Sequence, residues 1–291
     1  MGFACIVFAL VVGTWNGEWF PSGRAEHRAS PEVERATIRA AGRMLRNGLA
    51  AVDPTGREDV VLCLNEIRDA ETAEALCRAI GRTNLSVAVV TGYRRRDRFD
   101  QQQDAILTTL PAAAGSWSRW KTWRDATPPR GYARAELVVA PATTATVYAV
   151  HLKSNYGQTT EAIAESNRLK RGRAVGQLVE QERPKRGKFR APVVVAGDFN
   201  ADRFGKDAEK ESVFRTLEAA GFAGCFEGVP YEERVTHPGR GRGLGSTIDY
   251  VFFRGFERDG PPLVATASDV SDHNAVFVRL KPAPPSPAAP R

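Results

Sequence analysis

The chain has 291 residues, 42% of them apolar and 26% charged, which is enough to bury one sizeable core, although length alone would also allow two domains. Its formal net charge of +7 favours an anionic partner, although ordinary soluble proteins can also be basic. The four cysteines lie far apart and form no CxxC pair, which argues against a zinc site and favours structural thiols.

The first apolar stretch covers residues 3–12 and is too short to span a bilayer, so no transmembrane segment is expected there. It also lacks the positive first region and the small-residue cleavage site of a signal peptide. Because it runs directly into Gly13-Thr14-Trp15-Asn16, its second half is predicted to be the first core strand. Residues 1–8 could still be a truncated or mis-started export signal, so cytoplasmic and exported locations both stay open.

Strands are predicted to alternate with helices along the chain. Ser30 is a good N-cap, Pro31 suits the first helical position, and apolar residues then recur at helical spacing, which predicts a helix over 31–49. A buried strand is predicted over 59–67. It is followed by a helix that begins near Asp69 and ends at Gly81. The other predicted strands cover 85–91, 105–110, 132–140, 145–152, 193–198, 247–253 and 275–280, and the other predicted helices cover 160–182 and 208–220.

One domain is expected over residues 9–281, because strand-like runs and turn signals recur without a linker up to Pro282. Residues 282–291 are rich in Pro and Ala and have too few large apolar side chains to fold. We therefore expect a disordered tail, and we expect the protein to be a monomer.

Polar side chains gather where the predicted strands end. They are Asn16 and Glu18, Glu66, His151, Asp198 and Asn200, Asp249, and Asp272 with His273. Each alone has an ordinary explanation, because an acid before a turn often caps backbone amides and a lone His is more often a simple hydrogen bonder. So many clusters at the ends of buried strands would require as many independent coincidences, so we interpret them as one site.

These groups suit phosphodiester hydrolysis. Oxygen ligands without thiolates select a hard cation such as Mg²⁺, with Mn²⁺ as a substitute, and Glu66 fits the ligand role best. Asp198 would accept a proton from the attacking water, and Asn200 would hold water or a phosphate oxygen. Asp249 and His273 could form a pair that sets positive charge against the phosphoryl group.

At these residues the chain resembles the endonuclease/exonuclease/phosphatase superfamily, which includes DNase-like nucleases, abasic-site endonucleases, sphingomyelinases and inositol polyphosphate phosphatases. The motifs that carry the resemblance are Thr14-Trp15-Asn16, Leu64-Asn65-Glu66-Ile67, His151-Leu152-Lys153-Ser154, Gly197-Asp198-Phe199-Asn200, Ile248-Asp249-Tyr250 and Ser271-Asp272-His273. They follow the family's order across positions 10 to 280. The resemblance implies a four-layered α/β sandwich, in which helices flank two packed mixed β-sheets and the site lies at the strand ends.

The resemblance also implies roles for individual residues. The implied roles are Glu66 as principal Mg²⁺ ligand, Asn16 and Asp272 near metal or phosphate, Asp198 with Asn200 positioning the water, and His273 paired with Asp249. Glu18 is a further candidate ligand, and His151 a further catalytic candidate. Nuclease-like members support the equivalent of His151 with an acid, for which Asp104 is the candidate, although that element aligns ambiguously by one residue. Leu-Asn-Glu also stands where the family often has Leu-Gln-Glu, which keeps the acid.

The substrate expected first is a nucleic acid. The Leu-Asn-Glu-Ile-Arg and His-Leu-Lys-Ser elements resemble DNase-like members more than inositol phosphatases. Basic loops agree with a polyanion, although a solvated loop is the alternative. The expected substrate contacts are Asn16, Asn200, Lys153, Arg94, Arg95 and Arg96, and residues 183–190 form the second basic loop.

Two other functions stay open from the sequence. The first is a lipid (sphingomyelinase-like) or small-phosphoester hydrolase, for which Trp117, Trp120 and Trp123 could supply an apolar wedge, although such spacing is more often core packing. The second is a catalytically silent nucleic-acid-binding protein on the same fold, against which the intact set of acids and histidines argues.

Overall fold

The computed structural model describes residues 9–23, 29–95, 98–99, 102–123, 125–155, 157, 160–183, 191–239 and 244–284. Several predictions fall outside these residues, namely those on Cys5, the export signal of residues 1–8, Arg96, positions 184–190 of the second basic loop, and residues 285–291 of the tail. Among the described helices, none is long and apolar enough to cross a membrane.

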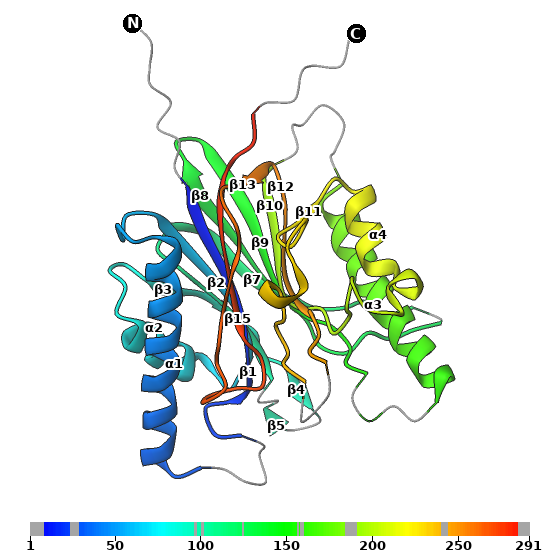
Figure 1. Ribbon diagram of the computed structural model, residues 1–291, viewed down its shortest axis with the longest axis horizontal. Coiled ribbons are helices and arrows are strands. Elements are labelled where there is room, and N and C mark those ends of the chain that lie inside the picture. Colours follow the sequence, from blue (N-terminus) through cyan, green and yellow to red (C-terminus); the bar gives the residue numbers. More distant parts are fainter. Residues whose placement is uncertain are drawn as a thin grey trace, which may run out of the picture.

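Two mixed β-sheets form the centre of the molecule (Figure 1). The seven-stranded sheet runs in the order β13-β15-β1-β2-β6-β3, with β14 also paired to β15. Its strands are β1 (Leu10–Phe20), β2 (Asp59–Ile67), β3 (Ser86–Val90), β6 (Gln103–Thr108), β13 (Phe256–Arg258), β14 (Leu263–Ala265) and β15 (Ala275–Pro282).

The six-stranded sheet runs in the order β11-β12-β10-β9-β8-β7. Its strands are β7 (Ala112–Arg119), β8 (Gly131–Ala140), β9 (Thr143–His151), β10 (Val193–Asp198), β11 (Ala223–Gly224) and β12 (Asp249–Arg254). A separate small hairpin joins β4 (Arg94–Arg95) to β5 (Arg98–Phe99).

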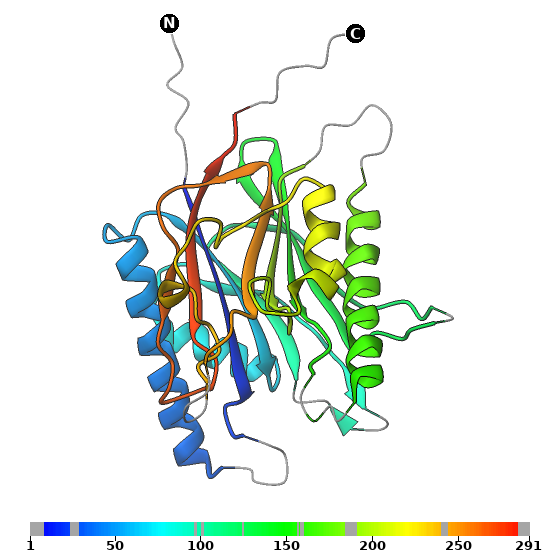
Figure 2. The same ribbon diagram turned by 45° about the vertical axis from the view of Figure 1, so that its right-hand side comes forward.

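Helices cover the outer face of each sheet, which confirms the four-layered sandwich (Figure 2). Helices α1 (Pro31–Val52) and α2 (Ala70–Ile80) pack on the seven-stranded sheet, and α3 (Glu161–Gln181) and α4 (Ser212–Ala219) pack on the other. Strand alternation explains the layers, because successive side chains point to opposite faces. In β1, Val11 contacts the α1/α2 layer, and its neighbour Val12 lies in the core that includes the second sheet. Strands buried on both faces carry the near-continuous apolar runs of the sequence.

Local signals place the helices where the sequence predicts them. The Ser30 hydroxyl accepts from the Val33 amide at 3.4 Å, and the Asp69 carboxylate accepts from the Thr72 amide at 2.8 Å. Gly81 ends α2 in the left-handed conformation at φ 68°. The helix predicted over 208–220 is instead a 3₁₀ turn over Ala208–Lys210 followed by α4.

Strand β7 is an edge strand that the sequence did not predict. Its sequence, Ala-Ala-Ala-Gly-Ser-Trp-Ser-Arg, has no alternating apolar pattern, and all of its residues are exposed. Gly115 within it passes close to β3, since a Cβ there would lie 2.6 Å from the Ala88 carbonyl oxygen. Of the three tryptophans in this region, Trp120 is buried, whereas Trp117 and Trp123 are 42% and 50% exposed.

Candidate functional site

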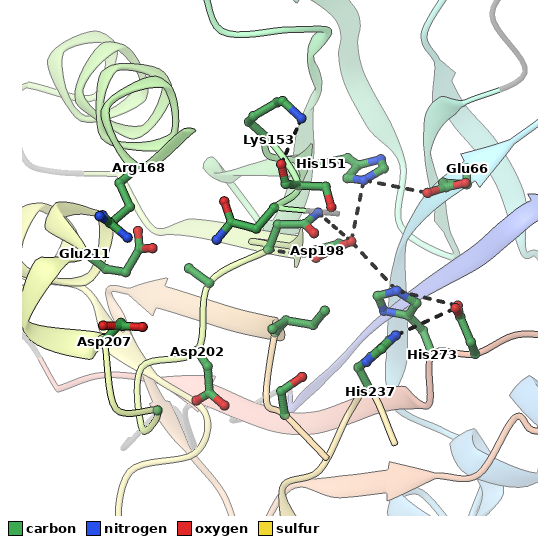
Figure 3. Close-up of a pocket in the computed structure, with 18 of the residues that line it drawn as sticks. Glu66, His151, Lys153, Arg168, Asp198, Asp202, Asp207, Glu211, His237 and His273 are labelled. Atoms are coloured by element: carbon green, nitrogen blue, oxygen red, sulfur yellow. Dashed lines mark hydrogen bonds and ion pairs between the residues drawn. The ribbon is translucent and has the colours of Figure 1, made fainter. Parts of the chain in front are cut away.

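The register of the sheets brings polar residues together at one edge of the sandwich. In the second sheet, Asp198 at the end of β10 lies opposite His151 of β9 on one side and Asp249 of β12 on the other. In the first sheet, Asn16 of β1 lies opposite Asn65 of β2. A cavity of about 940 Å³ opens at this edge, and Figure 3 shows the labelled side chains around it.

The backbone bends sharply at several of these positions. Glu18, Glu66 and Asn200 have positive φ angles of 49°, 58° and 51°. Such angles are uncommon outside glycine and cost free energy, so they persist only where the surroundings impose them. With Trp19 and Arg130, which also have positive φ angles, five such residues line one cavity, which supports a functional role for this edge.

Asn16 lies between two carboxylates, one from each sheet. Its side-chain amide donates to Oδ2 of Asp198 at 3.0 Å and lies 3.4 Å from Oε1 of Glu66. The backbone amide of Trp19 donates to the other oxygen of Glu66 at 3.1 Å. Since Asn16 is 1% exposed, this bridge holds both carboxylates in a fixed relation.

Asp198 is held by its own turn and lies beside a histidine. The Asn200 backbone amide donates to Oδ1 of Asp198 at 2.8 Å, and the Asn200 side-chain amide donates to Oδ2 at 2.9 Å. Nε2 of His151 lies 3.5 Å from Asp198 and 3.7 Å from Glu66. Burial and the charge of Asp249 raise the pKa of Asp198 to about 7. A carboxyl group with such a pKa can exchange a proton with water near neutral pH.

The pKa values of the two buried histidines are shifted in opposite directions. Burial lowers the pKa of His273, but the carboxylates of Asp249, Asp198 and Asp272 outweigh it and raise this pKa to about 10, which favours the charged form. Nδ1 of His273 lies 2.9 Å from Oδ2 of Asp249, so the structure brings the two residues of the predicted pair together. For His151, burial and then the positive charges around it lower the pKa well below its usual value, so His151 is neutral.

The expected pairing of Asp104 with His151 is not formed. Asp104 accepts hydrogen bonds from the Asn65 amide at 2.7 Å and the Tyr93 hydroxyl at 3.2 Å, and burial raises its pKa to about 7. Within the part of the chain that the structure describes, Nδ1 of His151 has no hydrogen-bond partner. The physical reason is that Asp104 already accepts a hydrogen bond from the side-chain amide of Asn65. The side-chain oxygen of Asn65 in turn accepts from the Asp198 backbone amide at 2.9 Å.

The predicted metal ligands all lie around the same edge. Glu66 lies beside Asn16, and Asp272 donates its backbone amide to Oε2 of Glu18 at 3.1 Å. Among the described residues, two groups of three have ligand atoms within 4.8 Å of one another: His237 with Asp272 and His273, and Asp198 with Asp249 and His273. Glu66 and Glu18 line the same cavity outside these groups, and their carboxylates are of the type that a hard divalent cation prefers.

The predicted substrate contacts are only partly together. Lys153 lines the cavity, whereas Arg94 is exposed on β4, where its carbonyl oxygen accepts from Arg119 at 2.8 Å. Arg95 lies on the same strand, and Arg96 lies outside the described residues. Contact of these arginines with substrate stays a prediction.

Sequence reasoning missed three residues at this site: Asn65, Arg130 and His237. Asn65 stands next to Glu66 in the recognised motif, which is a usable signal. His237 lies in a loop after the buried Thr236, with Nε2 3.7 Å from Asp272 and its ring 4.9 Å from that of His273. Arg130 donates from Nε to the His151 carbonyl oxygen at 3.1 Å. No sequence signal distinguishes the last two.

Comparisons with known proteins agree with this fold. The model of the Endonuclease/Exonuclease/phosphatase family matches residues 13–273. An endonuclease/exonuclease/phosphatase family protein from Bacteroides thetaiotaomicron is 15% identical with a TM-score of 0.63, covering 94% of this chain and 95% of that one. Sphingomyelinase C from Streptomyces griseocarneus is 17% identical with a TM-score of 0.59, covering 93% and 99%.

A third similar structure is humanized D. rerio TDP2, which is 13% identical with a TM-score of 0.57 and covers 94% of this chain and 98% of that one. At these identities the structures show a shared fold. No curated protein sequence matches the chain at a significant level.

Proposed function

Because the chain belongs to the endonuclease/exonuclease/phosphatase family, we propose that it is a divalent-metal-dependent phosphodiester hydrolase that cuts nucleic acid. Members of the family are generally phosphoester hydrolases. The observation that carries the proposal is the bridge from Asn16 to Asp198 and Glu66, next to the pair of His273 and Asp249. It sets a proton acceptor, a carboxylate suited to a metal and a fixed positive charge around one cavity.

In this proposal, Asp198 takes a proton from the attacking water while the water oxygen bonds to phosphorus and the bond to the leaving oxygen breaks. Asn200 orients that water. The charged ring of His273 faces the phosphoryl oxygens and stabilises the negative charge that develops on them. Glu66 would hold the metal with Asn16, Glu18 and Asp272 close by, and the bound ion would supply further positive charge to the phosphoryl group.

Nucleic acid is the substrate that the charges favour, because of the net charge of +7 and the basic β4–β5 hairpin. One observation favours a lipid phosphodiester as the second candidate: Trp117 and Trp123 are largely exposed and could enter a membrane surface. Arginine side chains also lie over aromatic rings in this region. The Arg173 guanidinium lies 5.2 Å from the centre of the Trp123 ring, and the Arg119 guanidinium lies 5.6 Å from the centre of the Tyr93 ring. Aromatic rings beside arginines also suit stacked bases.

The test is a substrate panel of DNA, RNA, sphingomyelin and phosphorylated inositols, each with and without Mg²⁺. We expect cleavage of nucleic acid that stops with excess EDTA and returns with Mg²⁺ or Mn²⁺. Glu66→Gln should weaken the metal dependence and keep the fold, as judged by circular dichroism. Full activity in EDTA would exclude the metal role. Binding of nucleic acid without any hydrolysis would favour the silent binding protein.

A further inference from the structure

Beyond His151, one wall of the cavity carries positive charges that form no ion pair with a carboxylate of the described residues. Arg130 and Lys153 line the cavity there, and Lys170 of α3 is close enough for its charge to lower the pKa of Lys153. The opposite arm of the cavity carries acidic groups as well as cations: Arg168 pairs with Glu161, Glu211 pairs with the buried Arg171, and Lys206 also lines the cavity. Figure 3 shows Arg168, Asp207 and Glu211 together on that arm, away from Glu66 and His273.

The hydrogen bonds of this wall go to neutral oxygens. Arg130 donates to the carbonyl oxygens of His151 and Leu152 at 3.1 and 2.8 Å and to the Gln102 side chain at 3.1 Å. Nζ of Lys153 donates to the Ser154 carbonyl oxygen at 2.8 Å. Throughout the described ranges, no carboxylate forms an ion pair with either cation. Burial raises the pKa of Asp104, and the charge of Arg130 offsets part of this rise without an ion pair between the two residues.

In the protein without ligand, the positive charges of this wall repel one another. Burial, and then the charges of Arg130, Lys170 and Arg171, lower the pKa of Lys153. Keeping this ammonium group charged in such surroundings is unfavourable, and an anion at the wall would offset the repulsion. Together with the position of Arg130 and Lys153 on the cavity wall, this repulsion favours an anion there.

The backbone that carries Lys153 is fixed from three sides. Arg171 donates to the Lys153 carbonyl oxygen at 2.7 Å and to the Asn155 side chain at 3.0 Å. Asn200 donates to the Leu152 carbonyl oxygen at 3.3 Å, and Arg130 holds the same oxygen. A site fixed before binding loses less entropy when the ligand arrives.

We propose that Arg130 and Lys153, with the charge of Lys170 nearby, bind a second phosphate of the substrate, next along the polynucleotide to the phosphodiester that is cut. Lys153 is two residues past His151, so the two Cα atoms lie at most about 7 Å apart. This assignment rests on the proposed function and narrows it, because a phosphocholine headgroup would present a cation to this wall.

The first experiment measures equilibrium binding without metal, by calorimetry in EDTA at low salt. The probes are thymidine 3′,5′-bisphosphate and thymidine 5′-monophosphate. We expect the wild type to bind the bisphosphate at least about tenfold more tightly, since hydrogen bonds to charged groups contribute about 1.5–3 kcal/mol each. Lys153→Met with Lys170→Met should reduce that ratio to below about threefold. Lys153→Arg should keep it.

Lys210→Met is the matched control, because it removes the same charge from a lysine already paired with Asp207 at 2.9 Å. It should keep the wild-type ratio. Thermal unfolding of each variant shows whether the fold is intact, and the single variant Lys153→Met serves if the double variant does not fold. Equal wild-type affinity for the two probes would overturn the second-phosphate site, as would an equal loss of affinity for both in the double variant.

The second experiment separates this proposal from the hydrolase itself. The dinucleotide TpT is compared with pTpT and TpTp in Mg²⁺, and one of the two phosphorylated forms should be cut with a higher kcat/KM by at least about tenfold. If no phosphodiester is hydrolysed but the bisphosphate preference and its loss in the double variant persist, the anion site stands and the hydrolase fails. If all three dinucleotides are cut at equal rates, the second-phosphate site fails and the hydrolase stands.

Discussion

Replacing Arg171 by Met should both destabilise the protein and slow catalysis, for separable reasons. Arg171 is 0% exposed and forms a two-point ion pair with Glu211, whose exposure is 6%. Removing one partner of a buried pair leaves the other charge unpaired, which typically costs about 3–5 kcal/mol of the free energy of unfolding. Met fills much of the same volume, so the loss arises mainly from Glu211 and from the freed loop.

The double variant Arg171→Met with Glu211→Met tests this cause. Replacing both partners of a buried pair by apolar residues is often neutral, so most of the stability should return in urea unfolding. Catalysis should not return, because the carbonyl oxygen of Lys153 and the side chain of Asn155 still lack the guanidinium that holds them. A single variant that loses less than about 1 kcal/mol, or a double variant with full turnover, would refute the reasoning.

Three further predictions concern the water, the pH dependence and the polyanion. Asp198→Asn should lower kcat by about a hundredfold or more and leave KM largely unchanged. A fully active variant would mean that another group is the base. Burial raises the pKa of Asp53, but hydrogen bonds to its carboxylate outweigh this and leave the pKa lowered. The contribution of Asp53 to the free energy of unfolding is therefore complete above its unfolded-state pKa of about 4, and it is lost as the pH falls through its folded-state pKa. We expect Asp53→Asn to lower the free energy of unfolding by about 1–2 kcal/mol at pH 7 and by less in acid, as measured by urea unfolding across pH. A cost that does not change with pH would contradict this origin. Replacing Arg94, Arg95 and Arg96 together by Ala should reduce the slope of log DNA affinity against log salt concentration by about two to three. An unchanged slope would mean that these arginines are solvated and do not contact the phosphates.

Much of the fold follows from local signals. Ser30 and Asp69 begin their helices, and the apolar run before Asp198 is a central strand, because these features depend on neighbouring residues alone. Strand β7 was missed because it is an exposed edge, where packing does not impose an apolar alternation. The broken helix near Glu211 was missed because the pairing with Arg171 is a tertiary contact.

The candidate site shows the same division. His273 with Asp249 was predicted from motifs that occur at the ends of strands, and the structure brings them together. The link from Asn65 to Asp104 depends on the pairing of β2 with β6, whose register shifts between Leu64 and Ile67. A shift of this kind has no signature in one sequence. The positive wall around Lys153 combines three separate segments, so only the folded chain reveals it.

The hydrogen bond from Asn16 to Asp198 has a mechanical consequence. Asn16 and Glu66 belong to one sheet, and Asp198 and His151 belong to the other, so the site is complete only when the two sheets are seated on each other. A small displacement of one sheet relative to the other would separate the reacting groups. The hydrogen bonds between the strands within each sheet would stay intact. Activity should therefore depend on how firmly the two sheets pack against each other. On heating, we expect activity to be lost at a lower temperature than the secondary structure.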